Sequence, residues 1–322
     1  MRFTIEDAQT MARQTLIAVG ASEALATSLA NATVAAELSG RHSVGFSHLL
    51  DYLDSITAGR IIGSAQPEIS FPTPAMIQVD ARGGIAQLGF DLAIDELQKR
   101  AELYGIAVFS QSNSYSAGEL GYYTRRLAKA GLVAVAATNG SAHVAAGKST
   151  EAVYGTNPLS FAAPTENGPP LLIDQASSAT AFVNVRRAAE SGEPIPEGWA
   201  IDTEGRPTTD ANEALKGALL AFGGDRGANI ALFVEILAAG VTGANWSLDA
   251  PSFADGNRSP GAGLLVIALK PAILAPNFST RLASHSARLA AKGIHIPGRK
   301  QSSLEIELPD SLVEAMSRYN KP

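Results

Sequence analysis

Short apolar segments bounded by turn-forming residues alternate with helical segments through the middle of the chain, and no other feature of the sequence constrains the fold as strongly. The strand-like segments are residues 75–79, 106–110, 132–138, 171–174 and 264–269. Apolar spacing predicts helices over residues 89–103 and 121–130, which lie between the first three of them. Such alternation by itself favours a doubly wound α/β fold with a parallel sheet.

The glycine-rich loops that bind phosphates in most such folds are absent. No G-x-G-x-x-G follows a predicted strand, and no G-x-x-x-x-G-K-[ST] occurs in the chain. Any dinucleotide that binds must therefore be held by other elements.

Both ends of the chain are predicted to be helical. Thr4 and Asp7 form a candidate capping box before the first apolar helical face. Further helices are expected over residues 48–57, 278–292 and 311–317. We therefore expect an N-terminal helical part, 1–74, that packs with C-terminal helices, 277–322, beside a cofactor-binding and catalytic domain, 75–276. Six glycines and prolines within residues 191–209 predict a long surface loop or lid.

The composition of the chain argues against nucleic acids, metal ions and membranes as its partners. With 322 residues, 46% apolar residues and a net charge of −6, the chain is typical of a globular protein with a large core rather than of a nucleic-acid-binding protein. The absence of cysteine excludes disulfides, thiolate metal sites and a cysteine nucleophile, and the five histidines lack metal-binding spacing. The first residues are too acidic for a signal peptide, and no run approaches the roughly 18 apolar residues that span a bilayer. We expect a cytoplasmic protein that binds neither a metal nor a membrane.

Two polar segments in the first half of the chain could carry chemistry. Residues 41–52 place Ser43, His48 and Tyr52 across a helix start, where hydroxyl and imidazole groups suit proton handling or carboxylate binding. Residues 111–123 lead from a strand end into a helix N-terminus, which suits an anion such as a cofactor phosphate. Each segment also fits an ordinary structure: a serine N-cap beside a surface histidine, or a capped connection between strand and helix.

Three further candidates lie later in the chain. Asp174 ends an apolar strand shortly after the turn Gly155–Pro158 and could accept hydrogen bonds from ribose hydroxyls, although it could equally cap the next turn. The glycine pair at 223–224, beside Arg226 at a helix start, could form an anion nest or a plain turn. Residues 295–300 form a basic turn, which is more often solvated surface than a binding site.

Taken together, in this order and at this spacing, the segments resemble the type 2 malate/L-lactate dehydrogenase family over nearly the whole chain. The most specific stretches are residues 43–61, 155–159, 195–200, 207–209 and 223–235. The family includes malate, sulfolactate and ureidoglycolate dehydrogenases, and reductases of Δ1-pyrroline- and Δ1-piperideine-2-carboxylate. The resemblance implies an α/β, non-Rossmann NAD(P)-binding fold with a mixed, largely antiparallel sheet, and a homodimer. This expectation overrides the parallel sheet that alternation alone favours.

The first family motif, D-S-H-G-x-x-R-x-x-x-Y, differs from this sequence at two functional positions. Ser43, Gly45 and Tyr52 match the motif. Its histidine falls on Val44, and its carboxylate-binding arginine falls on His48.

The second family motif, N-S-x-H-F-G-x-x-G-Y, differs at its histidine. In the hydroxyacid dehydrogenases that histidine is the acid/base at the carbonyl, and here it falls on Ser116. The residues that match are Asn113, Ser114, Gly118, Gly121 and Tyr122. Both imidazoles of the family motifs are therefore missing.

The missing imidazoles favour an imine over a ketone as the substrate. Reduction of a ketone creates an alkoxide, and a positioned acid contributes about 10²–10⁴-fold to such a step. A cyclic imine can bind a proton before it reacts, so that hydride addition neutralises a charge instead of creating one. We therefore interpret the chain as an NADPH- or NADH-dependent reductase of Δ1-pyrroline-2-carboxylate or Δ1-piperideine-2-carboxylate, giving L-proline or L-pipecolate.

The resemblance assigns expected roles to individual residues. Ser43, His48 and Ser116 would be catalytic, and Tyr52, Asn113 and Thr156 would bind the substrate. The dinucleotide would be held by Ser116, Ala117, Gly118, Glu119, Leu120, Asp174, Gln175, Ala176, Asp225, Arg226, Pro297, Gly298, Arg299 and Lys300. His48 would be either a carboxylate partner in place of the arginine or the proton donor. Ring size and the choice between NADPH and NADH stay open.

Two other functions are compatible with the sequence. The same fold could oxidise a 2-hydroxy acid such as malate, lactate or sulfolactate, with His48 as the acid/base. A cofactor-binding protein that has lost catalysis is the third possibility. The intact cofactor and lid motifs argue against it, because drift would not spare them selectively.

Overall fold

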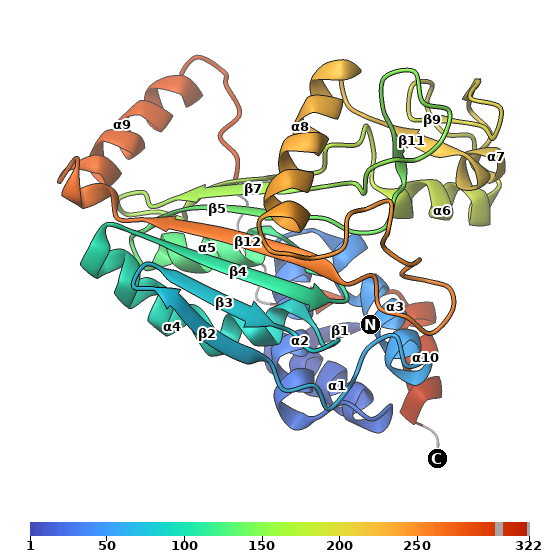
Figure 1. The fold of residues 1–322 in the computed structure, drawn as a ribbon, viewed down its shortest axis with the longest axis horizontal. Helices are drawn as coiled ribbons and strands as arrows, with labels where there is room; N and C mark the ends of the chain where they lie inside the picture. The colour runs from blue at the N-terminus through green and yellow to red at the C-terminus, as the bar shows by residue number, and fades with distance from the viewer. Residues whose placement is uncertain (300–304, 321–322) are drawn as a thin grey trace.

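A seven-stranded sheet forms the centre of the molecule, and the computed structural model describes residues 1–299 and 305–320 (Figure 1). In spatial order the strands are β2 (Glu68–Thr73), β3 (Met76–Asp80), β4 (Ile106–Ser114), β12 (Ala262–Leu269), β5 (Val133–Thr138), β7 (Leu159–Ala163) and β8 (Leu171–Gln175). Within this sheet β3 and β4 are parallel, whereas every other neighbouring pair is antiparallel. The mixed, largely antiparallel sheet is therefore confirmed, and the parallel sheet favoured by alternation is wrong.

The position of β12 explains why alternation misleads. This strand comes from late in the chain and lies between β4 and β5, antiparallel to both, so that Val266 pairs with Phe109 on one side and Ala136 on the other. Two strands that the sequence analysis did not predict, β2 and β7, complete the sheet. Since β2 lies within residues 1–74, that part of the chain is not wholly helical as expected.

Helices cover one face of the sheet, and its main core lies beneath them. The helices are α4 (Ala86–Tyr104) and α5 (Gly121–Lys129). Phe90 packs edge to face against Phe109 and Tyr123, with ring centroids 5.4 and 4.9 Å apart. On the other face, α8 (Asp225–Glu235) and the π turn η2 (Ile236–Gly240) pack near the ends of β5 and β12 (Figure 1).

The two ends of the chain pack together in a second core. Its elements are α1 (Ile5–Ala18), α2 (Glu23–Leu38), α3 (Phe46–Thr57), α10 (Asp310–Ser317) and the strand pair β1 (Arg2–Thr4) and β13 (Glu305–Glu307). Thr4 caps α1 as predicted, because the Asp7 amide donates to its hydroxyl at 3.1 Å. In the described part of the chain, no helix combines the length and the apolar character needed to cross a bilayer.

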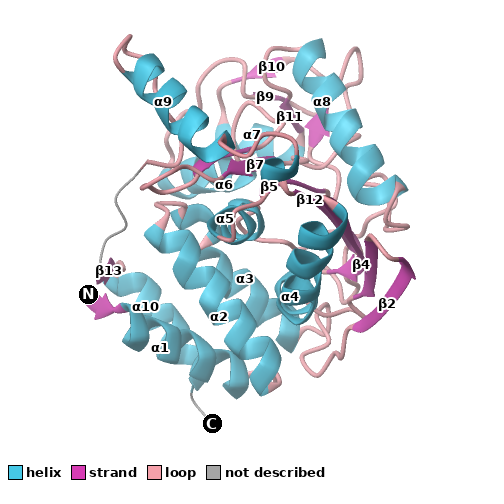
Figure 2. Ribbon diagram, turned by 90° about the vertical axis from the view of Figure 1, so that its left-hand side faces the viewer, coloured by secondary structure: helices cyan, strands magenta, loops and turns pink. Residues whose placement is uncertain are grey.

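One C-terminal helix departs from the expected packing of residues 277–322 against residues 1–74. Helix α9 (Phe278–Ala290) projects away from the N-terminal helices, at the opposite end of the molecule (Figures 1 and 2). Of its residues only Ser286 is buried, so the apolar side chains of α9 do not contribute to that core.

A small four-stranded sheet forms beside the main one. Its strands and flanking helices are β6 (Val144–Ala145), β9 (Ala200–Ile201), β10 (Pro207–Thr208), β11 (Ala218–Leu220), α6 (Phe182–Ser191) and α7 (Ala211–Lys216). The predicted loop or lid, residues 191–209, joins this sheet in part and is otherwise irregular and mostly exposed. Two strands of this sheet lie within them, and Ile195 is only 3% exposed because it packs into the core under α6 and α7.

Candidate active site

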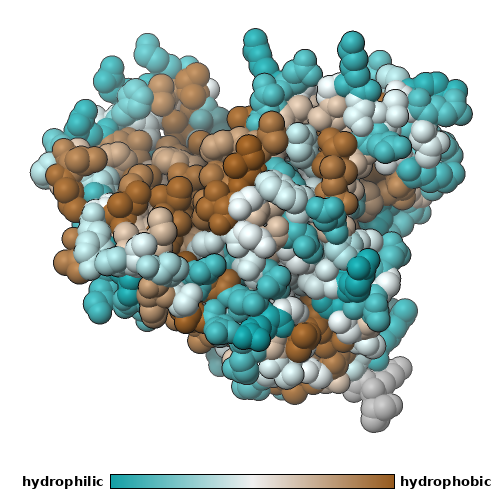
Figure 3. All heavy atoms as spheres, in the orientation of Figure 1, coloured by the Kyte–Doolittle hydropathy of each residue, from teal (hydrophilic) through white to brown (hydrophobic). Residues whose placement is uncertain are grey.

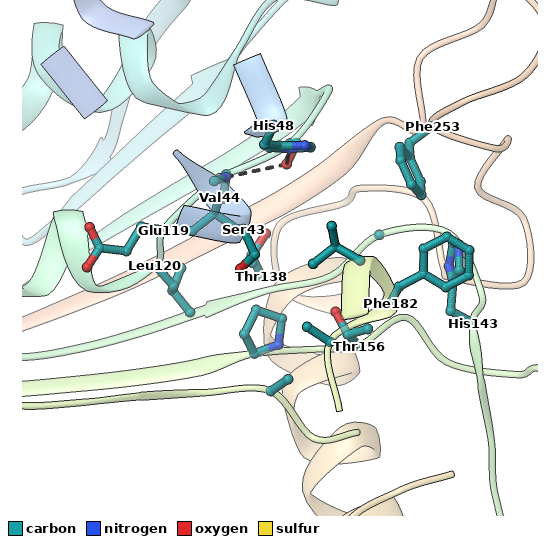
Figure 4. Close-up of a pocket in the computed structure, with 18 of the residues that line it drawn as sticks. Ser43, Val44, His48, Glu119, Leu120, Thr138, His143, Thr156, Phe182 and Phe253 are labelled. Atoms are coloured by element: carbon teal, nitrogen blue, oxygen red, sulfur yellow. Dashed lines mark hydrogen bonds between the residues drawn. The ribbon is translucent and has the colours of Figure 1, made fainter. Parts of the chain in front are cut away.

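A cavity of about 320 Å³ lies between the main sheet, the N-terminal helices and α6 (Figure 4). It is lined by the 3₁₀ turn η1 (His42–Val44), the first turns of α3, the connection from β4 to α5, the chain after β5, the turn before β7, the end of β8, α6 and the loop that carries Phe253. Several strands therefore end at this cavity, and they bring together side chains that are more than a hundred residues apart in sequence.

His48 occupies the middle of the cavity wall, between two hydrogen-bonding partners. Its Nδ1 is 2.8 Å from the Asp51 carboxylate, and its Nε2 is 3.5 Å from the hydroxyl of Ser116. Burial alone would raise the pKa of Asp51, but the hydrogen bond from His48 and the adjacent His48 and Arg186 lower that pKa below its usual value. Asp51 therefore stays ionised and holds the imidazole with Nδ1 protonated, so that Nε2 faces Ser116.

The entry into α3 is fixed by a buried carboxylate. Glu37 accepts a hydrogen bond from the Phe46 amide at 2.8 Å and contacts the imidazole of His42. Gly45 is required here, because a Cβ at this position would lie 2.3 Å from Glu37 Oε1. This contact sets the direction of η1 and α3, and thereby the positions of Ser43 and His48.

One end of the cavity, which we call the acidic end, is formed by Glu119 and Asp174. Asp174 accepts from the Gly121 amide at 2.8 Å, and burial, with the nearby Glu119, raises its pKa to about 6. Glu119 pairs with Arg125 at 2.7 Å through one oxygen, while its buried Oε1 has no hydrogen-bond partner among the described residues. This end therefore holds unused acceptor capacity.

Thr156 lines the cavity from a turn that is fixed by hydrogen bonds on the side away from the cavity. Asn157 in this turn donates to the buried carboxylate of Glu235 at 2.7 Å, and Glu235 also accepts from the amide and the hydroxyl of Ser247. The hydroxyl of Ser247 in turn accepts from the Gly155 amide at 2.9 Å. Glu235 therefore acts as a structural tie that positions Thr156, and it is not part of the cavity wall.

The other end of the cavity, which we call the aromatic end, is formed by His143, Phe182 and Phe253. The His143 ring lies 4.6 Å from that of Phe182 and 5.5 Å from that of Phe253, centroid to centroid. Its Nδ1 is 2.7 Å from the Ser141 carbonyl, which can only accept, so Nδ1 carries the proton and Nε2 a lone pair. Burial lowers the pKa of His143, and this ring is neutral at pH 7.

The loop that carries Phe253 is tied to the N-terminal core. The buried hydroxyl of Tyr115 donates to the Phe253 carbonyl at 2.9 Å and accepts from Ser55, which also accepts from Arg60. Arg60 donates a further hydrogen bond to the Gly256 carbonyl at 2.8 Å. The aromatic end is therefore anchored by a buried polar network.

Comparison with known proteins agrees with this architecture. A family model described as malate/L-lactate dehydrogenase matches residues 3–307. The chain belongs to the malate/L-lactate dehydrogenase family.

Individual relatives within this family carry different names. The chain is 35% identical to the (2R)-3-sulfolactate dehydrogenase (NADP(+)) of Chromohalobacter salexigens over 98% of this chain and 97% of the relative. It is 36% identical to the Δ1-pyrroline-2-carboxylate/Δ1-piperideine-2-carboxylate reductase of Pseudomonas aeruginosa over 84% of this chain and 81% of the relative. The solved Δ1-piperideine-2-carboxylate reductase of Pseudomonas syringae pv. tomato superimposes with a TM-score of 0.94 at 30% identity, covering 99% of each chain.

Many residues that the family motifs single out do meet in the cavity. The predicted residues that line it are Ser43, His48, Ser116, Ala117, Gly118, Glu119, Leu120, Thr156, Asp174, Gln175 and Ala176. Figure 4 shows Glu119 and Leu120 on one side, His143, Phe182 and Phe253 on the other, and Ser43 and His48 between them.

Two predicted substrate-binding residues do not line the cavity. Tyr52 is 2% exposed and packs behind His48, with ring centroids 4.7 Å apart, and burial raises its pKa to about 12. Asn113 is exposed near the end of β4, where its backbone has φ 58° and its side chain donates to Asp80 at 3.0 Å. Tyr52 therefore supports the imidazole from behind, and Asn113 connects the end of β4 to the end of β3.

Five predicted cofactor-binding residues also lie away from the cavity wall. Asp225 and Arg226 are exposed at the start of α8, where Asp225 borders a separate depression. The turn Pro297–Arg299 packs against β8 instead: the Pro297 carbonyl accepts from the Leu172 amide at 3.3 Å. The predicted Lys300 lies outside the described residues.

Four residues that the family motifs do not mark are part of the site. Asp51, His143, Arg186 and Phe182 line the cavity. The only sequence signal for Asp51 is its spacing of three residues from His48, which places both on one helix face. His143, Phe182 and Arg186 come from the chain after β5 and from α6, and no local pattern links them to His48.

Proposed function

We propose that this chain catalyses the NAD(P)H-dependent reduction of a cyclic imino acid, Δ1-pyrroline-2-carboxylate or Δ1-piperideine-2-carboxylate, to L-proline or L-pipecolate. The relative of Pseudomonas aeruginosa that is named for this activity is 36% identical, and the solved reductase of Pseudomonas syringae superimposes with a TM-score of 0.94 at 30% identity. Nucleic acid is not expected as a partner, because the chain carries a net charge of −6.

The contact of His143 Nδ1 with the Ser141 carbonyl is the observation that carries the proposal, because it leaves Nε2 facing away from that partner. A neutral imidazole with its proton on Nδ1 offers a lone pair at Nε2, and no hydrogen bond to Nε2 is found among the described residues. The N–H of a protonated cyclic imine can donate to such a lone pair, whereas the oxygen of a ketone cannot. The rings of Phe182 and Phe253 beside it suit the protonated imine, whose ring carbons are apolar and whose nitrogen carries a positive charge.

The acidic end and its neighbours fit a dinucleotide. The unpartnered Oε1 of Glu119 and the carboxylate of Asp174 can accept from sugar hydroxyls or from a carboxamide. The segments Ser116–Leu120 and Asp174–Ala176 would hold the cofactor, without the phosphate loop of a Rossmann fold. Bound there, NAD(P)H supplies the hydride that reduces C2 of the imine.

The protein's own groups then orient the imine and handle its proton. His48, held by Asp51, can give a proton to the ring nitrogen of a neutral imine or balance the charge of its carboxylate. Ser116 and Ser43 offer hydroxyls beside it, and Thr156 offers one from the opposite wall. Orientation of the reacting carbon by these groups can contribute several kcal/mol, out of the roughly 7–11 kcal/mol that well-aligned intramolecular reactions gain.

A substrate panel tests the proposal. We expect NADPH or NADH oxidation with Δ1-pyrroline-2-carboxylate and Δ1-piperideine-2-carboxylate to exceed that with pyruvate, oxaloacetate and sulfopyruvate. Faster turnover of any of these 2-oxo acids than of both imines would overturn it. The two rings differ by one methylene, which a pocket distinguishes by only about 1–3 kcal/mol, so both are expected to react.

A second candidate is the oxidation of a 2-hydroxy acid. It is favoured by the 35% identity to a sulfolactate dehydrogenase over 98% of the chain and by the Asp51–His48 pair, which is arranged like an acid/base. In that case the wild-type enzyme would oxidise malate, lactate or sulfolactate and would turn over the imines poorly. His48→Asn would abolish this oxidation.

We also propose that the enzyme is a homodimer. Large apolar side chains are exposed on α8, η2 and the segment that follows them: Leu232, Phe233, Ile236, Val241, Trp246 and Leu248. Figure 3 shows apolar surface over α8 and the neighbouring part of the molecule. A monomer rarely exposes such a continuous apolar patch. Sedimentation of wild type and Phe233→Asp tests this, with dimer and monomer expected respectively. A cytoplasmic location stays a prediction from sequence.

A further inference from the structure

Two arginines, Arg41 and Arg186, line the cavity, and among the described lining residues they alone carry a positive charge at every physiological pH. Arg41 is exposed and donates to the Asp174 carbonyl at 2.8 Å, so it belongs to the acidic end. Arg186 lies on α6, one turn after Phe182, and therefore beside the aromatic end. The two guanidinium groups thus serve opposite ends of the same cavity.

Arg186 is close to the proposed reaction centre. Its Nη1 and Nη2 lie 3.3 and 3.5 Å from the two oxygens of Asp51, the carboxylate that also holds His48 Nδ1 at 2.8 Å. Both distances to Asp51 are long for a charged pair, and the Arg186 side chain keeps 33% of its surface exposed. The guanidinium therefore has donors that Asp51 does not use and a surface that the cavity can reach.

We propose that Arg186 binds the carboxylate of the substrate, an inference that rests on the function proposed above. A 2-carboxylate next to the reacting carbon needs a cationic partner, and the arginine of the family motif falls on His48 in this chain. A neutral imidazole is a weak anchor for an anion, whereas a guanidinium presents several donors in a planar fork that matches a carboxylate. Arg186 supplies that fork from α6 instead of from α3.

This arrangement gives each group around the imine a separate task. Arg186 holds the carboxylate, the aromatic end packs against the ring, and His48 is left free to handle a proton. Asp51 connects the first and the third, because it contacts both Arg186 and His48. The replacement of the motif arginine by His48 is then a relocation of the positive charge and not its loss.

The test compares substrates with and without the carboxylate. Wild type, Arg186→Ala and Arg186→Lys are assayed with Δ1-pyrroline-2-carboxylate and with Δ1-pyrroline, which lacks the carboxylate. We expect Arg186→Ala to lower kcat/KM for the carboxylated imine about 10–100-fold more than it lowers kcat/KM for Δ1-pyrroline, mainly through KM. Arg186→Lys should keep part of the preference, since it retains a point charge but not the fork.

Arg187→Ala is the matched control, because Arg187 is the next residue on α6, is exposed and does not line the cavity. Binding of L-proline and of pyrrolidine, measured by calorimetry, provides a readout independent of turnover: only L-proline binding should weaken in Arg186→Ala. Equal preference for the carboxylate in Arg186→Ala and wild type, or an equal loss in Arg187→Ala, would overturn the assignment. Should Arg186→Ala not fold, Arg186→Lys decides by the same comparison. Failure of the proposed function would appear separately, as slow turnover of both imino acids by wild type.

Discussion

The two ends of the cavity differ in how far their polar groups are satisfied within the protein. At the acidic end, a buried oxygen of Glu119 has no partner among the described residues, and Asp174 has a pKa raised to about 6. At the aromatic end, His143 donates to a backbone carbonyl through Nδ1, and only its Nε2 lone pair is left for a ligand. Buried polar groups without partners are costly, so a site that keeps them is prepared for a polar ligand.

This difference separates recognition of the cofactor from recognition of the substrate. The acidic end offers carboxylate acceptors to the sugar hydroxyls or carboxamide of a dinucleotide. The aromatic end offers two rings, the Nε2 lone pair of His143 and, beside it, the guanidinium of Arg186. His48 lies between them, so changes at either end should alter a different measured quantity. The following variants test that separation.

The largest effect is expected at the centre. His48→Asn removes the group that can transfer a proton, and kcat/KM for the imine should fall about 10²–10⁴-fold. Binding of NAD(P)H, followed by its fluorescence, should be unchanged. His285→Asn is the control, because His285 is exposed on α9 and does not line the cavity. Full activity in His48→Asn would show that the substrate brings its own proton and that the centre only orients it.

At the aromatic end, Phe182→Ala removes a half-buried ring that contacts His143. We expect kcat/KM for the cyclic imines to fall about 10–200-fold, the range for lost apolar contact in a pocket, while pyruvate turnover changes little. Stopped assays with both substrates measure the ratio. Phe71→Ala, at an exposed residue outside the cavity, should leave that ratio unchanged. A parallel loss for imine and 2-oxo acid would mean that the ring does not select the substrate.

At the acidic end, Asp174→Asn keeps an acceptor for the Gly121 amide but removes the charge. Affinity for NAD(P)H should fall about 10-fold, since a charged acceptor forms the stronger hydrogen bond. The preference for imines over 2-oxo acids should not change. An altered substrate preference with unchanged cofactor affinity would contradict the division between the two ends.

The smallest effects concern stability of the cofactor-free protein against pH, where the two ends should act in opposite directions. The pKa of Asp174 is raised to about 6, so between pH 4 and 6 the folded state holds more protons than the unfolded chain, and stability falls as pH rises. The pKa of His143 is lowered, so below about pH 6.5 the unfolded chain takes up the proton and stability falls as pH falls.

Thermal melts across pH 4 to 7 check this opposition. Relative to wild type, Asp174→Asn should lose less stability as pH rises, and His143→Phe should lose less as pH falls, each by about 2–4 °C. Lys216→Gln, at an exposed residue on α7, serves as the control for a change of charge. Slopes that match wild type in both variants would mean that neither group differs between the folded and unfolded chains.

Local sequence signals predicted the elements that depend on neighbouring residues. The capping of α1 by Thr4 was predictable because cap and helix are adjacent. The five predicted strands all occur, since each has an apolar run bounded by turn formers. In contrast, β2 and β7 were missed. β2 carries Pro72 and is largely exposed, so it lacks a clear pattern, whereas β7 has the same length as the predicted β3 and β8.

Of the motif residues predicted for the candidate site, some line the cavity and others do not. Ser43, His48, Ser116 and Thr156 were identified from segments of the sequence, and they do line the cavity. Tyr52 and Asn113 belong to the same motifs but lie outside the cavity wall. A motif marks residues that matter either to the fold or to the site. Only the direction of each side chain in the structure shows which of these roles it has.

Short stretches of sequence were enough to predict the family, most helices, five strands of the main sheet and the segments from which the site is built. Three features depend on the folded chain: the insertion of β12 between β4 and β5, the gathering of His143 and Arg186 at the cavity of His48, and the opposite shifts that burial causes in the pKa values of Asp174 and His143. Strand pairing, burial and the partners of a charge all depend on residues distant in the chain, and no local pattern specifies them.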